Sequence, residues 1–374
     1  MKIVFCGGGT GGHVFPIIAI VRELRKISED KKLEIYYIGP KDEFGGVFLR
    51  QEDIKVKNIL AGKIRRYLSL TSLFENIFDI LIKMPLGILQ SFFWLILKNP
   101  DLIFSKGGFG SFPPVFSGWI LGIPIFLHES DILPGLANRI LSKFALKVFV
   151  SFPKTEYFPL KKIFLVGNPI RKEILEGLEE KAKKIFQISG EKPVVLILGG
   201  SQGAQRINEK VLEILPEFLR NFEILHQSGD KNYKEVKLTT EGMLREDLKK
   251  DYHLFTFLKE DQLREAYAIS DLIVSRAGSG SIFEIAAAGK PSILIPLPEA
   301  AQDHQIKNAY AYSQNGAAIV IEEANLTPRF FLERIRFLLQ NQKEIEKMSK
   351  AAKEFAKPLA AIIIANYILE YLTP

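Results

Sequence analysis

The chain has 374 residues, of which 47% are hydrophobic and 25% charged, the composition of a folded globular protein with room for two domains. Its formal net charge of +7 favours a phosphate-rich partner, but no cluster of Lys and Arg with interleaved aromatic residues points to nucleic acid. The single cysteine, Cys6, excludes an internal disulfide framework and fits a reducing cytoplasm.

Neither a signal peptide nor a membrane crossing is expected. The chain opens directly on a strand-like run. Its most apolar stretch, 84–97, has only 14 residues, whereas a spanning helix needs about 20. Residues 68–97 nevertheless repeat apolar side chains at helical spacing, with Lys and Arg around them, which predicts a helix pair with a cationic rim. Such a pair suits either a cover over the first sheet or contact with an anionic membrane surface.

Apolar runs predict two series of strands separated by helices. The first series lies at 2–6, 33–38, 102–105, 124–128 and 147–151, with helices starting near Val14, Phe74, Phe112 and Gly135. The second series lies at 193–198, 222–226, 253–256, 271–275, 292–296 and 317–321. Residues 158–171 are the expected crossing between two domains, and the last helix, 351–372, is a candidate to pack back on the first domain.

Each half of the chain holds two turns in which an apolar strand runs into glycines. They lie at 2–12 and 102–111 in the first half, and at 194–204 and 272–281 in the second. Backbone N–H groups in such turns, and at the helix N-terminus that follows, bind phosphate. The duplication predicts an α/β fold of two Rossmann-like, doubly wound domains that face a central ligand cleft.

The first turn, Gly7 to Gly12, fits the dinucleotide pattern G-x-G-x-x-G, which is weak evidence by itself. A nicotinamide site also needs an acidic residue at the end of the second strand, where this chain has Ile38-Gly39-Pro40. No G-x-x-x-x-G-K-[ST] motif is present, so a P-loop nucleotidase is not expected.

Several polar residues near the glycine turns are candidates for chemistry. His13 could act as a general base or simply begin a helix, and His128 could orient a substrate. Glu284 could bind a ribose diol or interact with a helix dipole, and Ser201 could bind a diphosphate or cap a helix. The sequence has no Asp-x-Asp pair and no His/Cys cluster, so no metal site and no cofactor is expected.

Seven motifs, in this order along nearly the whole chain, closely resemble the MurG family, the GT-B N-acetylglucosaminyltransferases of peptidoglycan synthesis. They are Gly8-Gly9-Thr10-Gly11-Gly12-His13-Val14-Phe15-Pro16, Lys106-Gly107-Gly108-Phe109, His128-Glu129, Gly167-Asn168-Pro169-Ile170-Arg171, Gly199-Gly200-Ser201-Gln202-Gly203-Ala204, Glu284-Ile285-Ala286-Ala287-Ala288-Gly289-Lys290-Pro291 and Asp303-His304-Gln305.

The resemblance implies inverting transfer of N-acetylglucosamine from UDP-N-acetylglucosamine (UDP-GlcNAc) to the muramyl 4-hydroxyl of lipid I, giving lipid II. It implies an acceptor-binding, membrane-facing domain at 1–166, joined by the final helix at 352–374, and a donor-binding domain at 167–351. It also implies peripheral attachment to the cytoplasmic face of the cell membrane. The implied base is His13, and the implied substrate-binding residues are Thr10, Gly11, Gly12, Asp131, Arg171, Ser201, Leu258, Ser279, Gly280, Ser281, Ile282, Phe283, Glu284, Gln305 and Asn308.

The chain departs from the family pattern at two places. The family commonly has His-Glu-Gln-Asn where this chain has His128-Glu129-Ser130-Asp131, so a carboxylate replaces an amide. Gln205 stands where the family commonly has arginine, with Arg206 one place later. Two alternatives stay open: a GT-B enzyme acting on another membrane lipid such as diacylglycerol, and a module that binds a nucleotide sugar or NAD without catalysis.

Overall fold

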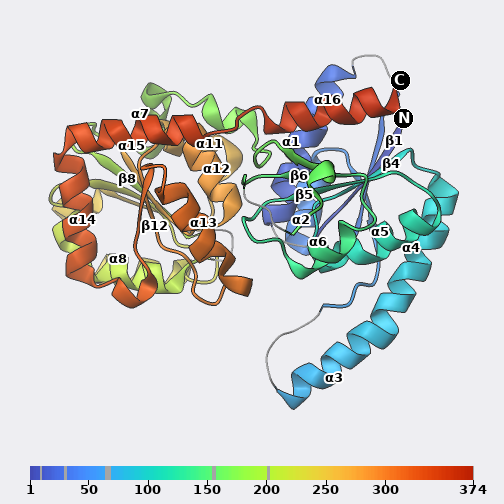
Figure 1. Ribbon diagram of the computed structural model, residues 1–374. Helices are drawn as coiled ribbons and strands as arrows, with labels where there is room; N and C mark the ends of the chain where they lie inside the picture. The colour runs from blue at the N-terminus through green and yellow to red at the C-terminus, as the bar shows by residue number, and fades with distance from the viewer. Residues whose placement is uncertain (9–10, 29–31, 64–68, 154–156, 200–202, 374) are drawn as a thin grey trace. The chain divides into compact units, whose positions relative to one another are not determined.

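The computed structural model describes residues 1–8, 11–28, 32–63, 69–153, 157–199 and 203–373 (Figure 1). The chain divides into two compact units, Met1–Arg171 with Pro358–Pro374, and Lys172–Lys357. The sequence placed the corresponding boundaries at 166/167 and 351/352. The expected doubly wound α/β architecture is confirmed, because each unit contains one parallel sheet with helices between consecutive strands.

The first unit is built on seven parallel strands within the described residues, in the order β3-β2-β1-β4-β5-β6-β7. The strands are β1 (Lys2–Cys6), β2 (Glu34–Gly39), β3 (Lys55–Asn58), β4 (Leu102–Ser105), β5 (Ile125–Glu129), β6 (Lys147–Val150) and β7 (Ile163–Leu165). The helices are α1 (Gly11–Ile27), α2 (Glu43–Gln51), α3 (Leu70–Phe78), α4 (Met84–Lys98), α5 (Phe112–Ile120), α6 (Leu136–Leu141) and α16 (Ala360–Leu372).

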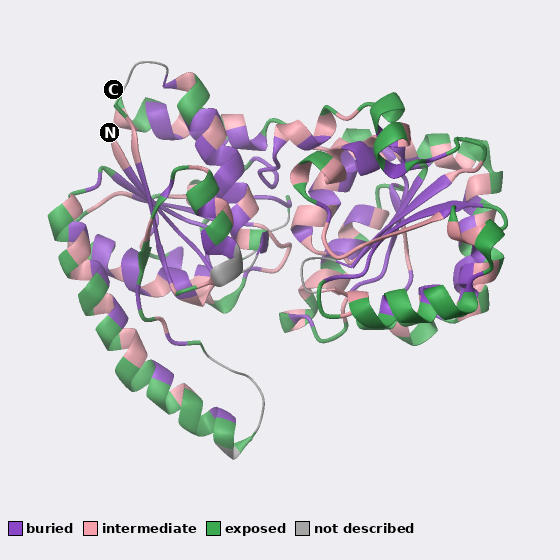
Figure 2. Cartoon of the chain, turned by 180° about the vertical axis from the view of Figure 1, so that it is seen from behind, coloured by how far each residue is buried: buried purple, intermediate pink, exposed green. Residues whose placement is uncertain are grey.

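Helices cover both faces of this sheet, so its central strands β1 and β4 are apolar on both faces, except at Lys2 and Ser105 at their ends. On β1, Ile3 and Phe5 pack in the cluster that contains α1 and α16, whereas Val4 and Cys6 pack in the cluster on the opposite face. Figure 2 shows these strands as buried. Burial raises the pKa of the Cys6 thiol to about 12, which fits a structural cysteine.

The second unit repeats the plan with six parallel strands in its described residues, in the order β10-β9-β8-β11-β12-β13. The strands are β8 (Val194–Leu198), β9 (Glu223–Gln227), β10 (Tyr252–Phe255), β11 (Leu272–Ser275), β12 (Ser292–Leu294) and β13 (Ala318–Val320). The helices are α7 (Glu179–Phe186), α8 (Gln205–Phe218), α9 (Tyr233–Met243), α10 (Glu246–Lys249), α11 (Glu260–Ile269), α12 (Ser279–Ala287), α13 (His304–Ser313), α14 (Pro328–Gln340) and α15 (Gln342–Phe355).

Both sheets reverse their strand order at one point, between β1 and β4 in the first unit and between β8 and β11 in the second. Ligands of doubly wound proteins bind outside the carboxyl ends of the strands at this switch point. The four glycine turns of the sequence follow these four strands. The fold therefore brings the turns together in pairs, one pair in each unit.

Two expected helices differ from the structure. The final helix, expected over 351–372, is two helices, α15 and α16, and Pro358 lies in the break between them because proline cannot continue a helix. The helix pair expected within 68–97 is one continuous helix, Thr71–Lys98, which we call the projecting helix (Figure 1). A π-turn at Asp79–Lys83 joins its halves, and the N–H of Met84 donates to the carbonyl of Asp79 just before Pro85.

Two helical stretches, Thr71–Lys98 and Gln342–Leu372, are long and apolar enough to cross a membrane by length and composition alone. The second contains α16, whose residues Ile364 and Ile368 pack in the core of the first unit. The first is longer than the 14-residue run noted in the sequence and is mostly exposed.

Candidate functional site

His13 lies in the first turn of α1, between the two glycine turns of the first unit. A Cβ built on Gly8 would be 3.1 Å from Cε1 of His13, and one built on Gly108 would be 3.1 Å from Nε2. The imidazole therefore packs against two bare backbone segments, one after β1 and one after β4. The hydroxyl of Tyr37 supports the first turn, because its single proton is shared between the carbonyls of Gly7 (3.2 Å) and Gly8 (3.3 Å).

Burial lowers the pKa of His13 to about 3, and the nearby Lys106 ammonium contributes in the same direction. The ring is therefore neutral at pH 7, which is the form that can accept a proton. An anionic ligand beside the ring would raise this pKa and make the imidazole a stronger base.

A buried charge cluster follows β4 and β5 at the same edge of the sheet. Lys106 is 3% exposed, and its Nζ donates to Oγ of Ser130. Glu129 accepts hydrogen bonds from the N–H of Asp131 (2.9 Å) and from Nδ2 of Asn138 (2.8 Å). Burial raises the pKa of Glu129 to about 7, with a further contribution from Asp131.

The sequence interpretation assigned no role to Lys106 or Glu129. The sequence feature that could have pointed to Lys106 was its position directly before two glycines, at the end of a switch-point strand. Asp131, an expected substrate contact, lies close enough to raise the pKa of both Glu129 and Lys106.

His128, in β5, and Arg171 hold the segment 167–171, which ends at the boundary between the two units. Nε2 of His128 is 3.0 Å from the carbonyl of Gly167, and the ring is fully buried, so it supports this segment rather than facing a ligand. The guanidinium of Arg171 stacks on the ring of Phe15, 4.2 Å from its centroid, which ties the end of the segment to α1.

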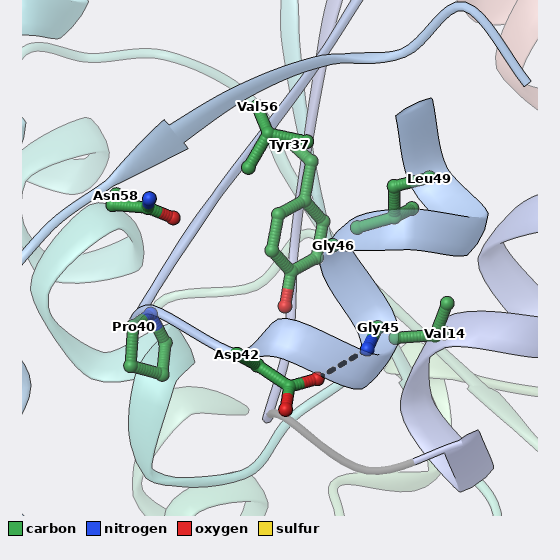
Figure 3. A pocket seen from close by; sticks show the side chains of 9 residues that line it. All are labelled: Val14, Tyr37, Pro40, Asp42, Gly45, Gly46, Leu49, Val56 and Asn58. Atoms are coloured by element: carbon green, nitrogen blue, oxygen red, sulfur yellow. Dashed lines mark hydrogen bonds between the residues drawn. The ribbon is translucent and has the colours of Figure 1, made fainter. Parts of the chain in front are cut away.

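A small pocket lies between α1, α2 and the strands β2 and β3, and Figure 3 shows the nine residues that line it. Asp42, the first acidic residue after β2, is one of them. Its Oδ2 accepts the N–H of Gly45 (2.6 Å) and so caps α2. Asp42 thus serves as a helix cap, and β2 itself ends on Ile38-Gly39 without an acidic residue, which weighs against a nicotinamide site.

In the second unit, α12 begins directly after β11 and carries the expected segment Ser279–Glu284. Ser279, Ile282 and Phe283 are buried, whereas Glu284 is half-buried. The hydroxyl of Tyr267 donates to Oε2 of Glu284 at 3.3 Å and orients the carboxylate. Glu284 is therefore a positioned hydrogen-bond acceptor at the carboxyl edge of this sheet.

The other expected donor-site residues follow two further strands of this sheet: Leu258 comes after β10, and Gln305 and Asn308 lie on α13, after β12. The N–H of Leu258 donates to Oε1 of Gln227 (2.9 Å), so a base bound through that N–H would have to replace the amide. Oε1 of Gln305 accepts from the N–H of Leu297 (3.0 Å), and Nδ2 of Asn308 donates to the carbonyl of Ala277 (3.5 Å). The last bond joins α13 to the turn that precedes α12.

Two expected site residues, Thr10 and Ser201, lie outside the described residues; Gly11 and Gly12 open α1. Arg206, adjacent to the departure at Gln205, forms ion pairs with Glu299 and Glu323. Across the described parts of the chain, no group of three or more His, Cys, Asp or Glu residues could hold a metal ion.

Comparison with known proteins identifies the two units. Residues 3–150 match the glycosyltransferase family 28 N-terminal domain, and residues 194–362 match its C-terminal domain. The chain is 38% identical over 371 residues to a Bacillus thuringiensis (strain Al Hakam) protein named UDP-N-acetylglucosamine--N-acetylmuramyl-(pentapeptide) pyrophosphoryl-undecaprenol N-acetylglucosamine transferase 3, covering 99% of each chain. A Clostridium tetani protein with the same name, without the number, is 37% identical over 93% of each chain.

Among solved structures, Acinetobacter baumannii MurG aligns with a TM-score of 0.73 at 24% identity, over 99% of each chain. A Neisseria meningitidis UDP-GlcNAc 2-epimerase bound to UDP-GlcNAc aligns with a TM-score of 0.67 at 17% identity, over 99% of this chain and 100% of the other. At these identities the structures establish the shared two-unit fold, whereas the full-length relatives establish the family.

Proposed function

Because this chain belongs to glycosyltransferase family 28 and to its MurG members, we propose that it transfers N-acetylglucosamine from UDP-GlcNAc to lipid I, giving lipid II for peptidoglycan synthesis. Lipid I is the undecaprenyl-pyrophosphoryl muramyl peptide in the names of the relatives. The observation that carries the proposal is 38% identity over 99% of both chains, which includes both units. Similarity in one unit alone would leave the acceptor undefined.

The first unit is the proposed acceptor side, with His13 as general base. The imidazole accepts the proton of the muramyl 4-hydroxyl while that oxygen attacks the anomeric carbon. The bond from this carbon to the UDP oxygen breaks, and UDP leaves with the electron pair. A direct displacement of this kind inverts the configuration at the anomeric carbon. The position of the imidazole against both glycine turns of this unit supports the assignment.

The second unit is the proposed donor side. Glu284 accepts hydrogen bonds from the ribose diol, and its orientation by Tyr267 supports this role. Leu258 faces the uracil, Ser279 to Phe283 line the pocket, and Gln305 and Asn308 meet the sugar hydroxyls. The N-termini of α8 and α12 follow the two switch-point strands, where backbone N–H groups stabilise the charge that develops on the diphosphate. Thr10, Gly11, Gly12, Asp131, Arg171 and Ser201 complete the proposed set.

The projecting helix is the proposed membrane contact. One face of it, with Asp79, Ser91 and Leu95, is buried, and apolar side chains are exposed around most of the remaining circumference rather than along one stripe, a pattern found in helices that insert into an apolar medium. Leu81 and Leu97 are 68% and 81% exposed. Lys98 places a positive charge at the C-terminal end of the helix, whereas Lys83 pairs with the buried Asp79 at 2.6 Å. Its exposed large apolar residues are Leu73, Phe74, Ile77, Phe78, Ile80, Leu81, Ile82, Leu86, Leu89, Phe93, Ile96 and Leu97. We place the protein peripherally at the membrane surface that presents lipid I.

Product analysis tests the proposed function. The purified protein is incubated with UDP-GlcNAc and either lipid I or diacylglycerol, and the lipid products are identified by mass spectrometry. The expected result is one N-acetylhexosamine added to lipid I and no product from diacylglycerol. Transfer to diacylglycerol alone would indicate a different GT-B enzyme, and binding of UDP-GlcNAc without any transfer would indicate a non-catalytic module.

A further inference from the structure

Lys106 places a buried ammonium at the switch point of the first sheet. It directly follows β4 and lies beside the turn after β1, since a Cβ built on Gly7 would be 3.6 Å from that of Lys106. Two glycines come next in the chain, Gly107 and Gly108, both with positive φ (83° and 81°), so bare backbone surrounds the lysine. His13 packs against the same Gly108 turn.

A hydrogen-bond chain holds this ammonium in place. Nζ of Lys106 donates to Oγ of Ser130, and Oγ of Ser130 donates to Oδ1 of Asn168 at 3.0 Å. Asn168 is 1% exposed and lies just before the boundary between the units at Arg171. The lysine is therefore fixed by residues from two other strand ends and does not extend into solvent.

Two carboxylates, those of Glu129 and Asp131, lie close enough to Lys106 to act on its pKa. Glu129 accepts hydrogen bonds from Asn138 and from the N–H groups of Asp131 and Gly135. Burial lowers the pKa of Lys106 to about 8, although both carboxylates act to raise it, and an anion in contact with the ammonium would reduce this cost of burial.

We propose that Lys106 is a further acceptor-binding residue, whose ammonium contacts the diphosphate of the lipid acceptor beside His13. The inference rests on the proposed function, because it takes its ligand from that reaction. Three features favour a phosphate: the switch-point position, the two glycine turns and the N-terminus of α1, whose backbone N–H groups also attract anions. Lys106 thereby fixes the end of the acceptor next to the attacking hydroxyl.

Steady-state kinetics of Lys106→Met and Lys106→Arg test the proposal. The matched control is Lys57→Met, which removes one exposed lysine from the edge strand β3 of the same unit. For each protein, KM is measured for lipid I and for UDP-GlcNAc, together with the inhibition constant of farnesyl diphosphate as an acceptor mimic. Thermal melting of each variant reports folding.

Lys106→Met is expected to raise KM for lipid I and the inhibition constant of farnesyl diphosphate by about 10- to 100-fold, the effect of one charged hydrogen bond. KM for UDP-GlcNAc should stay within about twofold, and Lys57→Met should match the wild type. Lys106→Arg should retain acceptor binding above pH 8, where the wild type weakens as its lysine loses a proton.

Three results would overturn the proposal. One is an unchanged inhibition constant of farnesyl diphosphate in a folded Lys106→Met variant. Another is a rise in KM for UDP-GlcNAc instead of lipid I, which would assign the lysine to the donor diphosphate. The third is an equal loss for both substrates, which would indicate a structural role. A wild-type protein that transfers nothing to lipid I would instead reject the proposed function itself.

Discussion

Replacing Gly108 with alanine should impair catalysis through His13 without affecting the donor site. Gly108 has φ 81° and ψ 168°, a region that residues with a side chain rarely adopt. An added Cβ would lie 3.0 Å from the backbone nitrogen of Gly8 and 3.1 Å from Nε2 of His13. The methyl group would thus push apart the two turns that hold the imidazole.

The expected loss has two parts. The backbone strain costs about 1–3 kcal/mol of folding free energy. The contacts with Gly8 and His13 require a shift of a few tenths of an ångström, and displacement of a catalytic group by about 1 Å costs about 100-fold in rate. We therefore expect kcat to fall by about 4- to 10-fold, with a moderate decrease in melting temperature.

Gly122→Ala is the matched control. Gly122 lies in the same unit with φ 70°, but a Cβ there would have no atom within 4 Å, so this variant carries strain without the push on His13. Initial rates with lipid I, calorimetric affinity for UDP-GlcNAc and melting temperatures are compared. The reasoning is refuted if the two variants lose the same activity, or if Gly108→Ala weakens donor binding as much as turnover.

Three further predictions concern the donor site, acid stability and the membrane. Glu284→Gln should weaken UDP-GlcNAc binding by about tenfold. Tyr267→Phe should weaken it by less, because Tyr267 only orients the carboxylate. Wild-type affinity of Glu284→Gln in calorimetry would reject the ribose contact. Burial lowers the pKa of His226 to about 3, so the unfolded chain binds a proton that the native ring does not, and the free energy of unfolding should fall as pH drops from 6.5 toward 3. Denaturant titrations should show a shallower fall for His226→Gln, and an unchanged slope would contradict this. Leu81→Glu should reduce co-sedimentation with anionic vesicles about tenfold. Leu238 is equally exposed, at 67%, but lies in the second unit, so Leu238→Glu should leave co-sedimentation unchanged. Equal losses in the two variants would argue against the projecting helix as the membrane contact.

The sequence predicted the central strands well because they are buried on both faces and therefore apolar over most of their length. It missed β3, whose residues Lys55-Val56-Lys57-Asn58 lie at a polar sheet edge, and β7, a three-residue strand within the expected crossing. Local pattern identifies a strand only where packing requires apolar residues at successive positions.

The candidate site shows the same limit. The glycine turns and His13 could be located from their own short motifs. The buried state of Lys106 depends on Ser130 and Asn168, which follow other strands of the sheet, so it becomes visible only once those strands are paired. The single projecting helix likewise depends on how a π-turn accommodates the residues before Pro85.

The measurement that tests the central claim most directly is turnover of His13→Ala with lipid I beside its affinity for UDP-GlcNAc. The account predicts a loss of about 100- to 10,000-fold in kcat, the contribution of a general base, with donor affinity unchanged. Turnover within a fewfold of the wild type, in a variant that still binds UDP-GlcNAc, would contradict the assignment of His13 as the base.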